Sequence, residues 1–333
     1  MQVNYLTPNL NISGGVKVKL EHCTRLAERG HTVTLVVTKK TKPKQKWFPL
    51  SKKVKIVSIG CKDLKSRLPD ADILIANHWP YCQDLPPTKG RLLVPRQIEE
   101  RVTKDQIKAM KRVPDLWLPN SPSVEKILHS CGLLNTCIVR NGVNHKWFNP
   151  NGQQGARRIF TQLNLKKRRK GGPETLHVLK RIHRDYPDVE IYGFGQKSSS
   201  KYGKVPSWMH FFNVGPTGLP DLYRRCGIFF YAALLDGFAN SVAEAMACGC
   251  IVVTSKNAGV PFALAGKNAV TFSPGNNEEA LRELRFVLDT WENGKELWDV
   301  TRTFALKEIR QYTWSASVDQ LECAMEIAMT YRS

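Results

Sequence analysis

The sequence predicts an α/β protein made of two doubly wound, Rossmann-like domains. Three observations lead to this fold class. The chain has 333 residues, more than a single hydrophobic core usually supports. Short β-branched segments alternate with helical ones, as in parallel βαβ units. The pattern then starts again after a turn-rich segment at 142–155, which indicates a linker between two domains.

The first half begins with a βαβ unit. The strand "VNYLTP" leads to a Gly-rich turn at 13–15, and apolar residues at 16, 20, 23 and 26 then follow a helical period. Gly30 ends that helix before the strand 31–38. A later helix at 121–132 has Ser121 as N-cap and Pro122 in its first turn. Further strands are expected at 54–59, 71–77, 91–96, 115–120 and 136–141.

The second half repeats this alternation, starting with a strand at 157–163, a basic loop and a helix at 173–187. Ligands of such domains bind beyond the carboxyl ends of the strands, so we expect the site in a cleft between the two domains. Further strands are expected at 189–195, 209–215, 226–233, 250–255 and 269–273, and helices at 219–226, 240–249, 276–294 and 312–333.

Composition excludes several classes of protein. No apolar run approaches the ~18 residues of a membrane-spanning helix. The first residues lack a basic start and an apolar stretch, so we expect no signal peptide and a cytoplasmic location. None of the nine cysteines forms a CxxC pair, which favours reduced thiols used as small apolar side chains.

Charge is unevenly distributed along the chain. The net charge is +21, and residues 1–150 hold 26 basic and 11 acidic residues, a surplus of +15. Such a field attracts polyanions, whether nucleic acid, an anionic membrane surface or an acidic polymer. The alternative is a basic surface that only keeps the protein in solution.

The stretch 236–255 combines two carboxylates with an expected helix start. The spacing of Ser241 and Glu244 is that of a capping box, so a helix should begin near Asn240 or Ser241. The amides of 237–239 would then suit a phosphate. Glu244 could bind a ribose and Asp236 a sugar hydroxyl; alternatively, Glu244 closes the capping box and Asp236 is a turn residue.

Three other stretches could contribute to a binding site. Five consecutive basic residues at 166–170 suit a pyrophosphate, a nuclear-localisation-like tract or a general polyanion patch. The Gly-rich turn at 13–15 permits close approach of a ligand. His78 follows the strand 71–77, where a cleft residue is expected, although a single His is often structural.

Taken in order, these stretches resemble the GT-B glycosyltransferases, specifically the retaining family 4. The resemblance lies in "SGGVKVKLEHCTRLAERGHTVTLVV" (13–37), "RNGVNHKWFNP" (140–150) and "DGFANSVAEAMACG" (236–249). In the last motif Asp236 stands where the family usually has Glu, and Asn144 replaces a usual Asp. The resemblance implies a GT-B fold with a central cleft. It also implies an acceptor-binding domain at 1–147, a donor-binding domain at 148–315, and a helix at 316–333 that packs back onto the first domain.

The resemblance also implies roles for individual residues. Glu244 would hold the ribose of a UDP- or GDP-sugar, and Asp236 and the backbone of the following turn would address the sugar and the distal phosphate. His78 would lie near the transferred sugar, and Lys170 with one of the two preceding arginines would neutralise the pyrophosphate. No cluster of metal-ligating side chains stands out in these motifs, so we expect retaining, metal-independent transfer without a cofactor. The residues assigned to the donor are Gly14, Gly15, Arg168, Arg169, Lys170, Gly237, Phe238, Ala239, Asn240, Ser241 and Glu244.

Two basic clusters, 38–55 and 104–112, could bind the acceptor. One hypothesis is DNA with a hydroxylated base, as in virus-type DNA base glycosyltransferases. The alternative is a lipid or envelope polysaccharide at an anionic membrane, with Trp47 and Phe48 docking on it. A non-catalytic polyanion-binding module is a third hypothesis, and the oligomeric state is not predicted. The residues assigned to the acceptor are Lys44, Lys46, Trp47, Lys52, Lys53, Lys108, Lys111 and Arg112.

Overall fold

The protein was analysed as a computed structural model, which describes residues 1–38, 47–76, 85, 90–96, 114–153, 155–195, 203–215, 217–256, 259–263 and 265–330. The chain divides into two compact units. Unit 1 comprises Met1–Gly142 and Trp314–Ser333, and unit 2 comprises Val143–Thr313. The boundaries therefore fall at 142/143 and 313/314, beside the predicted 147/148 and 315/316.

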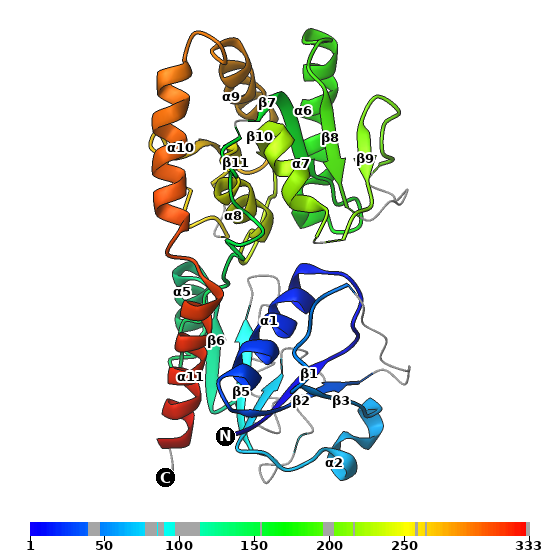
Figure 1. The fold of residues 1–333 in the computed structure, drawn as a ribbon, viewed down its shortest axis with the longest axis vertical. Helices are drawn as coiled ribbons and strands as arrows, with labels where there is room; N and C mark the ends of the chain where they lie inside the picture. The colour runs from blue at the N-terminus through cyan, green and yellow to red at the C-terminus, as the bar shows by residue number, and fades with distance from the viewer. Residues whose placement is uncertain are drawn as a thin grey trace. The chain divides into compact units, whose positions relative to one another are not determined.

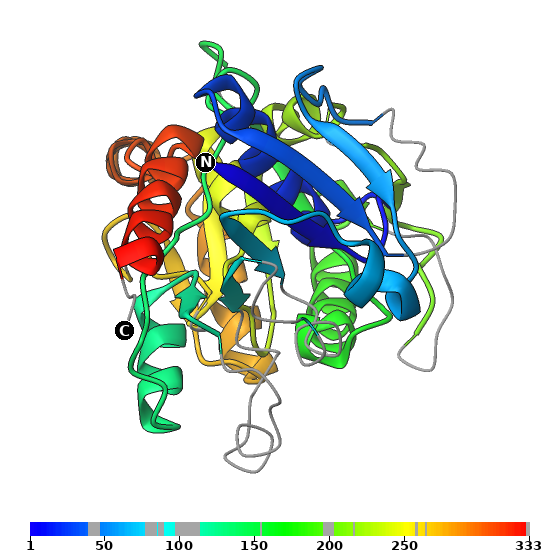
Figure 2. The same cartoon turned by 90° about the horizontal axis from the view of Figure 1, so that it is seen from below.

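Unit 1 contains a parallel sheet of six strands in the order β3-β2-β1-β4-β5-β6. The neighbouring strands β1, β2 and β3 are visible in Figure 2 as blue arrows that run the same way. Because the chain builds outward from β1 to β3 and then returns to β4, the switch point of this sheet lies between β1 and β4. The strands are β1 (Gln2–Thr7), β2 (Thr32–Val37), β3 (Lys55–Ser58), β4 (Ile73–Ala76), β5 (Arg91–Arg96) and β6 (Leu116–Pro119).

Two long helices of unit 1, α1 and α11, pack together on one face of the sheet (Figure 1). The residues that predicted the first helix, Val16, Leu20, Cys23 and Leu26, are all buried in the core beneath it. Burial of such an apolar stripe is the main stabilising force for a helix in a small domain. The helices are α1 (Gly14–Glu28), η1 (Cys61–Asp63), α2 (Leu64–Arg67), α5 (Pro122–Ser130) and α11 (Trp314–Thr330).

Unit 2 repeats the same architecture with the strand order β12-β11-β10-β7-β8-β9, again all parallel. Its first strand β7 is central, so the switch point lies between β7 and β10. The strands are β7 (Ala156–Gln162), β8 (Ile191–Phe194), β9 (His210–Phe212), β10 (Cys226–Tyr231), β11 (Ile251–Ser255) and β12 (Val270–Phe272). The helices are η3 (Arg168–Lys170), α6 (Gly172–Asp185), α7 (Leu219–Arg225), α8 (Asn240–Ala247), α9 (Asn277–Asp289) and α10 (Lys295–Ile309).

The predicted fold class is confirmed, but three local predictions are wrong. The segment 136–141 forms only an isolated bridge to β6, because the amide of Arg140 turns to the Gln320 side chain on α11. Helix α10 was missed because its exposed apolar residues Leu297, Val300 and Phe304 obscure the period of its buried ones. The buried residues are Trp298, Thr301, Ala305 and Ile309. The basic loop contains the short helix η3.

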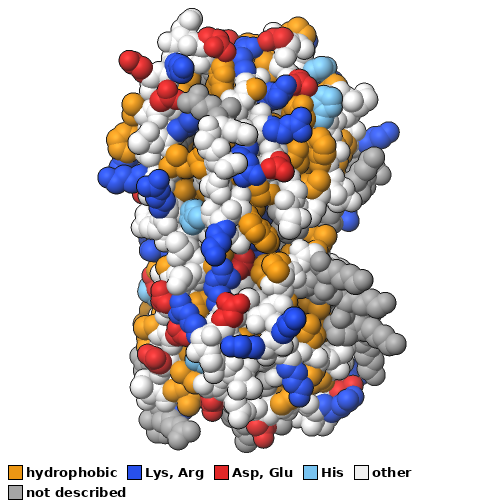
Figure 3. All heavy atoms as spheres, in the orientation of Figure 1, with side chains coloured by type: hydrophobic (Ala, Val, Ile, Leu, Met, Phe, Trp, Pro, Cys, Tyr) orange, Lys and Arg blue, Asp and Glu red, His pale blue; other side chains and the backbone are white. Residues whose placement is uncertain are grey.

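Each described helix is too short or too polar to span a lipid bilayer. On the face drawn in Figure 3, lysine and arginine side chains are scattered among acidic and apolar ones. The described part of this face therefore carries its positive charge as dispersed cations.

Candidate functional site

The switch point of unit 2 brings together two loops that are far apart in the sequence. The turn η3 follows β7, and residues 232–239 follow β10, the neighbouring strand. The carbonyl of Arg169 accepts hydrogen bonds from the amides of Leu234 and Leu235, at 2.9 and 3.0 Å. The carboxyl ends of β7 and β10 therefore hold the basic run against the segment that contains Asp236.

Gly171 makes this approach possible. Its φ is +67°, and a Cβ placed there would lie 1.8 Å from the carbonyl oxygen of Ala232. Any other side chain would push η3 away from the end of β10. Gly171 then serves as the N-cap of α6.

Lys170 and Asp236 form an ion pair at the centre of the site. The Nζ of Lys170 donates to Asp236 Oδ2 at 2.6 Å, and the phenol of Tyr231 donates to the same oxygen at 2.6 Å. The other oxygen, Oδ1, accepts the amide of Gly237 at 2.9 Å. Asp236 is only 4% exposed. Both of its carboxylate oxygens are therefore buried and hydrogen-bonded within the protein.

The ionisation states of these groups follow from their surroundings. Burial raises the pKa of Asp236, but Lys170 and the hydrogen bonds outweigh burial and hold that pKa below its ordinary value. Burial lowers the pKa of Lys170, and Asp236 opposes that change. Burial and the adjacent carboxylate raise the pKa of Tyr231 well above its ordinary value. At neutral pH the cluster is therefore a carboxylate held by an ammonium and a neutral phenol.

The structure separates the two arginines between which the sequence left a choice. Both terminal guanidinium nitrogens of Arg168 contact Glu174, at 2.7 and 2.5 Å, and the Arg168 side chain is about half exposed. Arg169 points to the other side, where it donates to the carbonyl of Leu235 and lies 3.9 Å from Asp236. Arg169 thus shares the switch point with Lys170, whereas Arg168 is held by α6.

The turn before α8 uses several of its amides internally. Gly237 donates to Asp236, Ala239 to the carbonyl of Gly259, and Asn240 to the carbonyl of Phe238. Within the described residues, this leaves the amides of Phe238 and Ser241 to meet an anion at the start of α8. That helix has no acidic residue in its first turn, which suits an anion there.

The predicted capping box is absent. Helix α8 does start at Asn240, as expected, but its N-cap Ala239 has no side-chain cap. The hydroxyl of Ser241 instead donates to Gln162 at the end of β7, at 3.0 Å. Glu244 is buried and receives the phenol of Tyr223 at 3.4 Å. Ser241 is therefore not the N-cap of α8.

The residues predicted in unit 1 fall into two groups. Gly14 and Gly15 form the exposed first turn of α1, which Ser13 caps by accepting the amide of Val16. His78, Lys44, Lys46, Lys108, Lys111 and Arg112 lie outside the described residues.

The described part of the first basic cluster is partly a core element. The indole of Trp47 donates to the carbonyl of Leu10 at 2.8 Å, and its ring packs against the core of unit 1. Phe48 is buried, so it is not placed to dock on a membrane. Lys52 and Lys53 are exposed.

Sequence reasoning missed two residues of this site. Tyr231 ends β10 and Gly171 follows the basic run. The only signal for Tyr231 was a polar group at the end of an otherwise apolar strand. For Gly171 the signal was its place between a basic run and a helix, which is typical of phosphate-binding loops.

A known protein family matches the part of unit 2 that contains this site. Residues 156–290 match the family of group 1 glycosyl transferases. The matched segment contains η3, Asp236 and α8. A curated protein from rice (Oryza sativa subsp. japonica), a probable sucrose-phosphate synthase 4, is 31% identical over 102 residues. That match covers 29% of this chain and 9% of the rice protein.

Solved structures resemble the whole chain. Sucrose-phosphate synthase from Thermosynechococcus elongatus superposes with a TM-score of 0.76 at 15% identity, covering 97% of both chains. Anabaena Alr3699/HepE in complex with UDP-glucose gives a TM-score of 0.76 at 12% identity, covering 98% of this chain and 99% of the other. At such identities the likeness establishes the fold, which is GT-B, as the sequence predicted.

Proposed function

We propose that this protein is a retaining glycosyltransferase that moves a sugar from a nucleoside-diphosphate sugar to an acceptor hydroxyl. The observation that carries the proposal is the contact of Arg169 and Lys170 with residues 235–236, the segment that leads into α8, at the switch point of unit 2. This is the place where doubly wound domains bind nucleotides. The match of residues 156–290 to group 1 glycosyl transferases supports it.

The chemistry needs a stabilised leaving group. The bond between the anomeric carbon and the β-phosphate oxygen breaks, and its electron pair remains on the departing diphosphate. Fixed cations stabilise that charge as it develops, because they are already oriented in a site with little water. Lys170 and Arg169 fill this role in the proposal. The acceptor oxygen then attacks an oxocarbenium-like centre from the same face, and its proton passes to the departing phosphate.

Asp236 has a different role in this proposal from the one expected from the sequence. Its oxygens are occupied by Lys170, Tyr231 and Gly237, so we assign it to orienting the Lys170 ammonium. Glu244 remains the proposed ribose ligand. UDP-glucose, which is bound in the Anabaena HepE structure, is the first donor to test here.

The acceptor is defined here only as a hydroxyl-bearing compound. Of the eight residues assigned to a polyanionic acceptor, five lie outside the described residues and Trp47 packs in the core. The DNA hypothesis therefore stays a prediction from net charge. The membrane-envelope alternative loses Phe48 as a docking residue.

The test is direct. The full chain is incubated with UDP-glucose and with GDP-mannose, and release of the free nucleotide is followed with and without a panel of acceptors. Calorimetry measures UDP binding in parallel. We expect nucleotide release and a measurable affinity for UDP or GDP, reduced in Glu244→Gln and unchanged in the exposed control Glu296→Gln. A chain that binds neither nucleotide is not a glycosyltransferase of this kind.

A further inference from the structure

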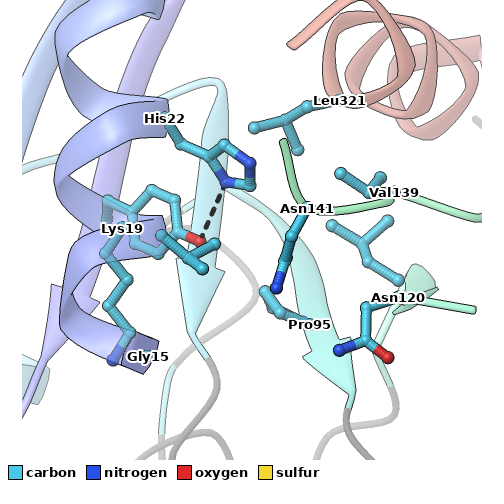
Figure 4. A pocket seen from close by; sticks show the side chains of 11 residues that line it. Gly15, Lys19, His22, Pro95, Asn120, Val139, Asn141 and Leu321 are labelled. Atoms are coloured by element: carbon cyan, nitrogen blue, oxygen red, sulfur yellow. Dashed lines mark hydrogen bonds between the residues drawn. The ribbon is translucent and has the colours of Figure 1, made fainter. Parts of the chain in front are cut away.

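Unit 1 contains a small cavity to which the proposed function assigns no role. It lies between α1, α11 and the carboxyl-terminal halves of β1, β5 and β6, and its volume is about 30 Å³. By the usual measure this is room for about two water molecules. Figure 4 shows Lys19 and His22 on α1 at one side, with Asn120, Asn141 and Val139 at the other.

Asn120 gives the first indication of a ligand. It is 6% exposed, and its Oδ1 is buried without a hydrogen-bond partner in the described part of the chain. Buried polar atoms are nearly always bonded, and leaving one unbonded costs about 1–3 kcal/mol. The residue directly follows β6 and lines the cavity. An acceptor atom in this position points to a ligand that supplies a donor.

Lys19 gives the second indication. It is 5% exposed, and its Nζ donates to the hydroxyl of Thr7 at 3.3 Å. It lies one turn after Gly15 on the same face of α1, and both line the cavity. An ammonium group has only donors, so a group that meets it must accept.

The ring of His22 limits what else can enter. Its Nδ1 lies 3.4 Å from the hydroxyl of Tyr5, and its Nε2 lies 3.0 Å from that of Ser317. Burial lowers the pKa of His22 to about 3, so the ring is neutral. His22 therefore adds no charge to the cavity and is held in place from both sides.

These groups together select a hydroxyl. A hydroxyl both accepts from an ammonium and donates to a carboxamide oxygen, whereas a carboxylate only accepts and an ammonium only donates. Two heavy atoms fit the volume, and apolar side chains such as Val139 and Leu321 suit a methylene. We propose that this cavity holds the hydroxymethyl arm of a hexose acceptor.

This proposal rests on the proposed function and names the acceptor class. A hexose fits better than a hydroxymethylated base in DNA, because Lys19 is the only charged side chain among the described residues that line the cavity. Holding a nucleic-acid backbone requires several cations.

Binding of simple probes tests the proposal without turnover. Methyl α-glycosides of glucose, galactose and mannose, and the 6-deoxy form of each, are titrated onto the full chain by NMR, with and without UDP. We expect at least one parent glycoside to bind at least about tenfold more tightly than its 6-deoxy form, the loss expected for a buried hydrogen-bonding group left unpaired.

Asn120→Leu is the decisive variant, because it has nearly the same shape and removes the unbonded oxygen. We expect it to abolish the preference for the parent glycoside while leaving the urea midpoint unchanged or higher, since no internal bond of Oδ1 is lost. Asn135→Leu, at an exposed position of the same unit, is the control and should change neither quantity.

Three outcomes overturn the proposal. They are equal binding within all three glycoside pairs, a preference that survives Asn120→Leu, and binding of a 5-hydroxymethylcytosine duplex in the absence of glycoside binding. UDP affinity is measured in the same samples. If UDP binds normally and the glycosides do not discriminate, only the acceptor proposal fails. If the glycosides discriminate and UDP does not bind, the cavity binds a hexose but the proposed function, and with it the acceptor role, fails.

Discussion

The two units share one strand order and place a pair of glycines at the same position, yet they use that position differently. In unit 1 the first helix starts at Gly14 and Gly15, capped by the neutral Ser13. In unit 2 it starts at Gly172, after Gly171 and a run of five basic residues. The fold therefore supplies the same kind of strand-to-helix turn in both units, and the residues before the helix decide the charge of that turn.

The space around the two glycines differs between the units. A Cβ on Gly15 would meet nothing within 4 Å, whereas a Cβ on Gly171 would collide with the backbone of Ala232. Gly171 is thus required by packing inside its own unit. Gly15 is not, because the described part of unit 1 leaves open space around it.

The largest expected effect concerns charge in unit 2. Lys170→Met should lower the turnover of a nucleotide sugar by about 10²- to 10³-fold, because it removes a fixed cation from the leaving group. The measurement is nucleotide release at saturating donor. Lys180→Met, at an exposed position on α6, is the matched control and should keep full turnover. Full activity in Lys170→Met would show that the cation before α6 does not stabilise the leaving group.

The second prediction tests the two glycines. Gly171→Ala should destabilise the protein by about 3–4 kcal/mol, from the left-handed backbone and the collision with Ala232. Gly15→Ala should change stability by less than about 0.5 kcal/mol, because open space surrounds it. Urea unfolding of both variants checks this contrast. Equal costs at the two positions would contradict the packing argument.

The third prediction uses the neutral His22 of unit 1. Its pKa in the folded protein, about 3, lies below that of an unfolded histidine, so the unfolded chain binds the proton first as pH falls. This contribution to stability is complete above about pH 6.5 and decreases toward pH 3. Between pH 7 and 4.5 it should amount to about 2–3 kcal/mol.

His22→Gln supplies the comparison for that prediction. Urea unfolding at the two pH values should give a smaller loss of stability in the variant than in the parent protein. All other titrating groups cancel in this difference. An identical pH dependence would mean that His22 is charged in the folded state, contrary to its burial.

The smallest effect distinguishes the two arginines. Arg169→Ala should weaken UDP binding about tenfold, as expected for one charge-assisted contact. Arg168→Ala should change it by less than about threefold, because that guanidinium is held by Glu174. Calorimetry on both variants decides the assignment, and a reversed order would place the pyrophosphate on the α6 side of the turn.

Much of the fold was predictable from local patterns. The apolar residues of α1 recur at the helical period and are buried, and Ser121 caps α5 as expected. The strand prediction for 136–141 was wrong because the backbone of this segment bonds to α11, about 180 residues later in the chain. Local periodicity reports which face is buried, but it does not report which distant element competes for a backbone amide.

In the candidate site, too, the local motifs were predictable and the contacts between distant residues were not. The sequence singled out the basic run 166–170 and the motif at 236–249, since both have residue types and spacings with their own chemical meaning. It did not reveal that Lys170 and Asp236, 66 residues apart, form an ion pair. It also did not reveal that the hydroxyl of Ser241 bonds to Gln162 on β7.

By itself, then, the sequence determined the alternation of strands and helices, the two-domain plan and the charge of each helix start, because these depend on periods and residue types that are local. The tertiary structure alone decided which arginine joins Lys170, and that the oxygens of Asp236 are occupied. It also decided that the Asn120 oxygen beside the cavity has no partner among the described residues. The physical reason is the crossover of the parallel sheet. It places the ends of strands that are distant in the chain side by side, and contacts there depend on register and side-chain length.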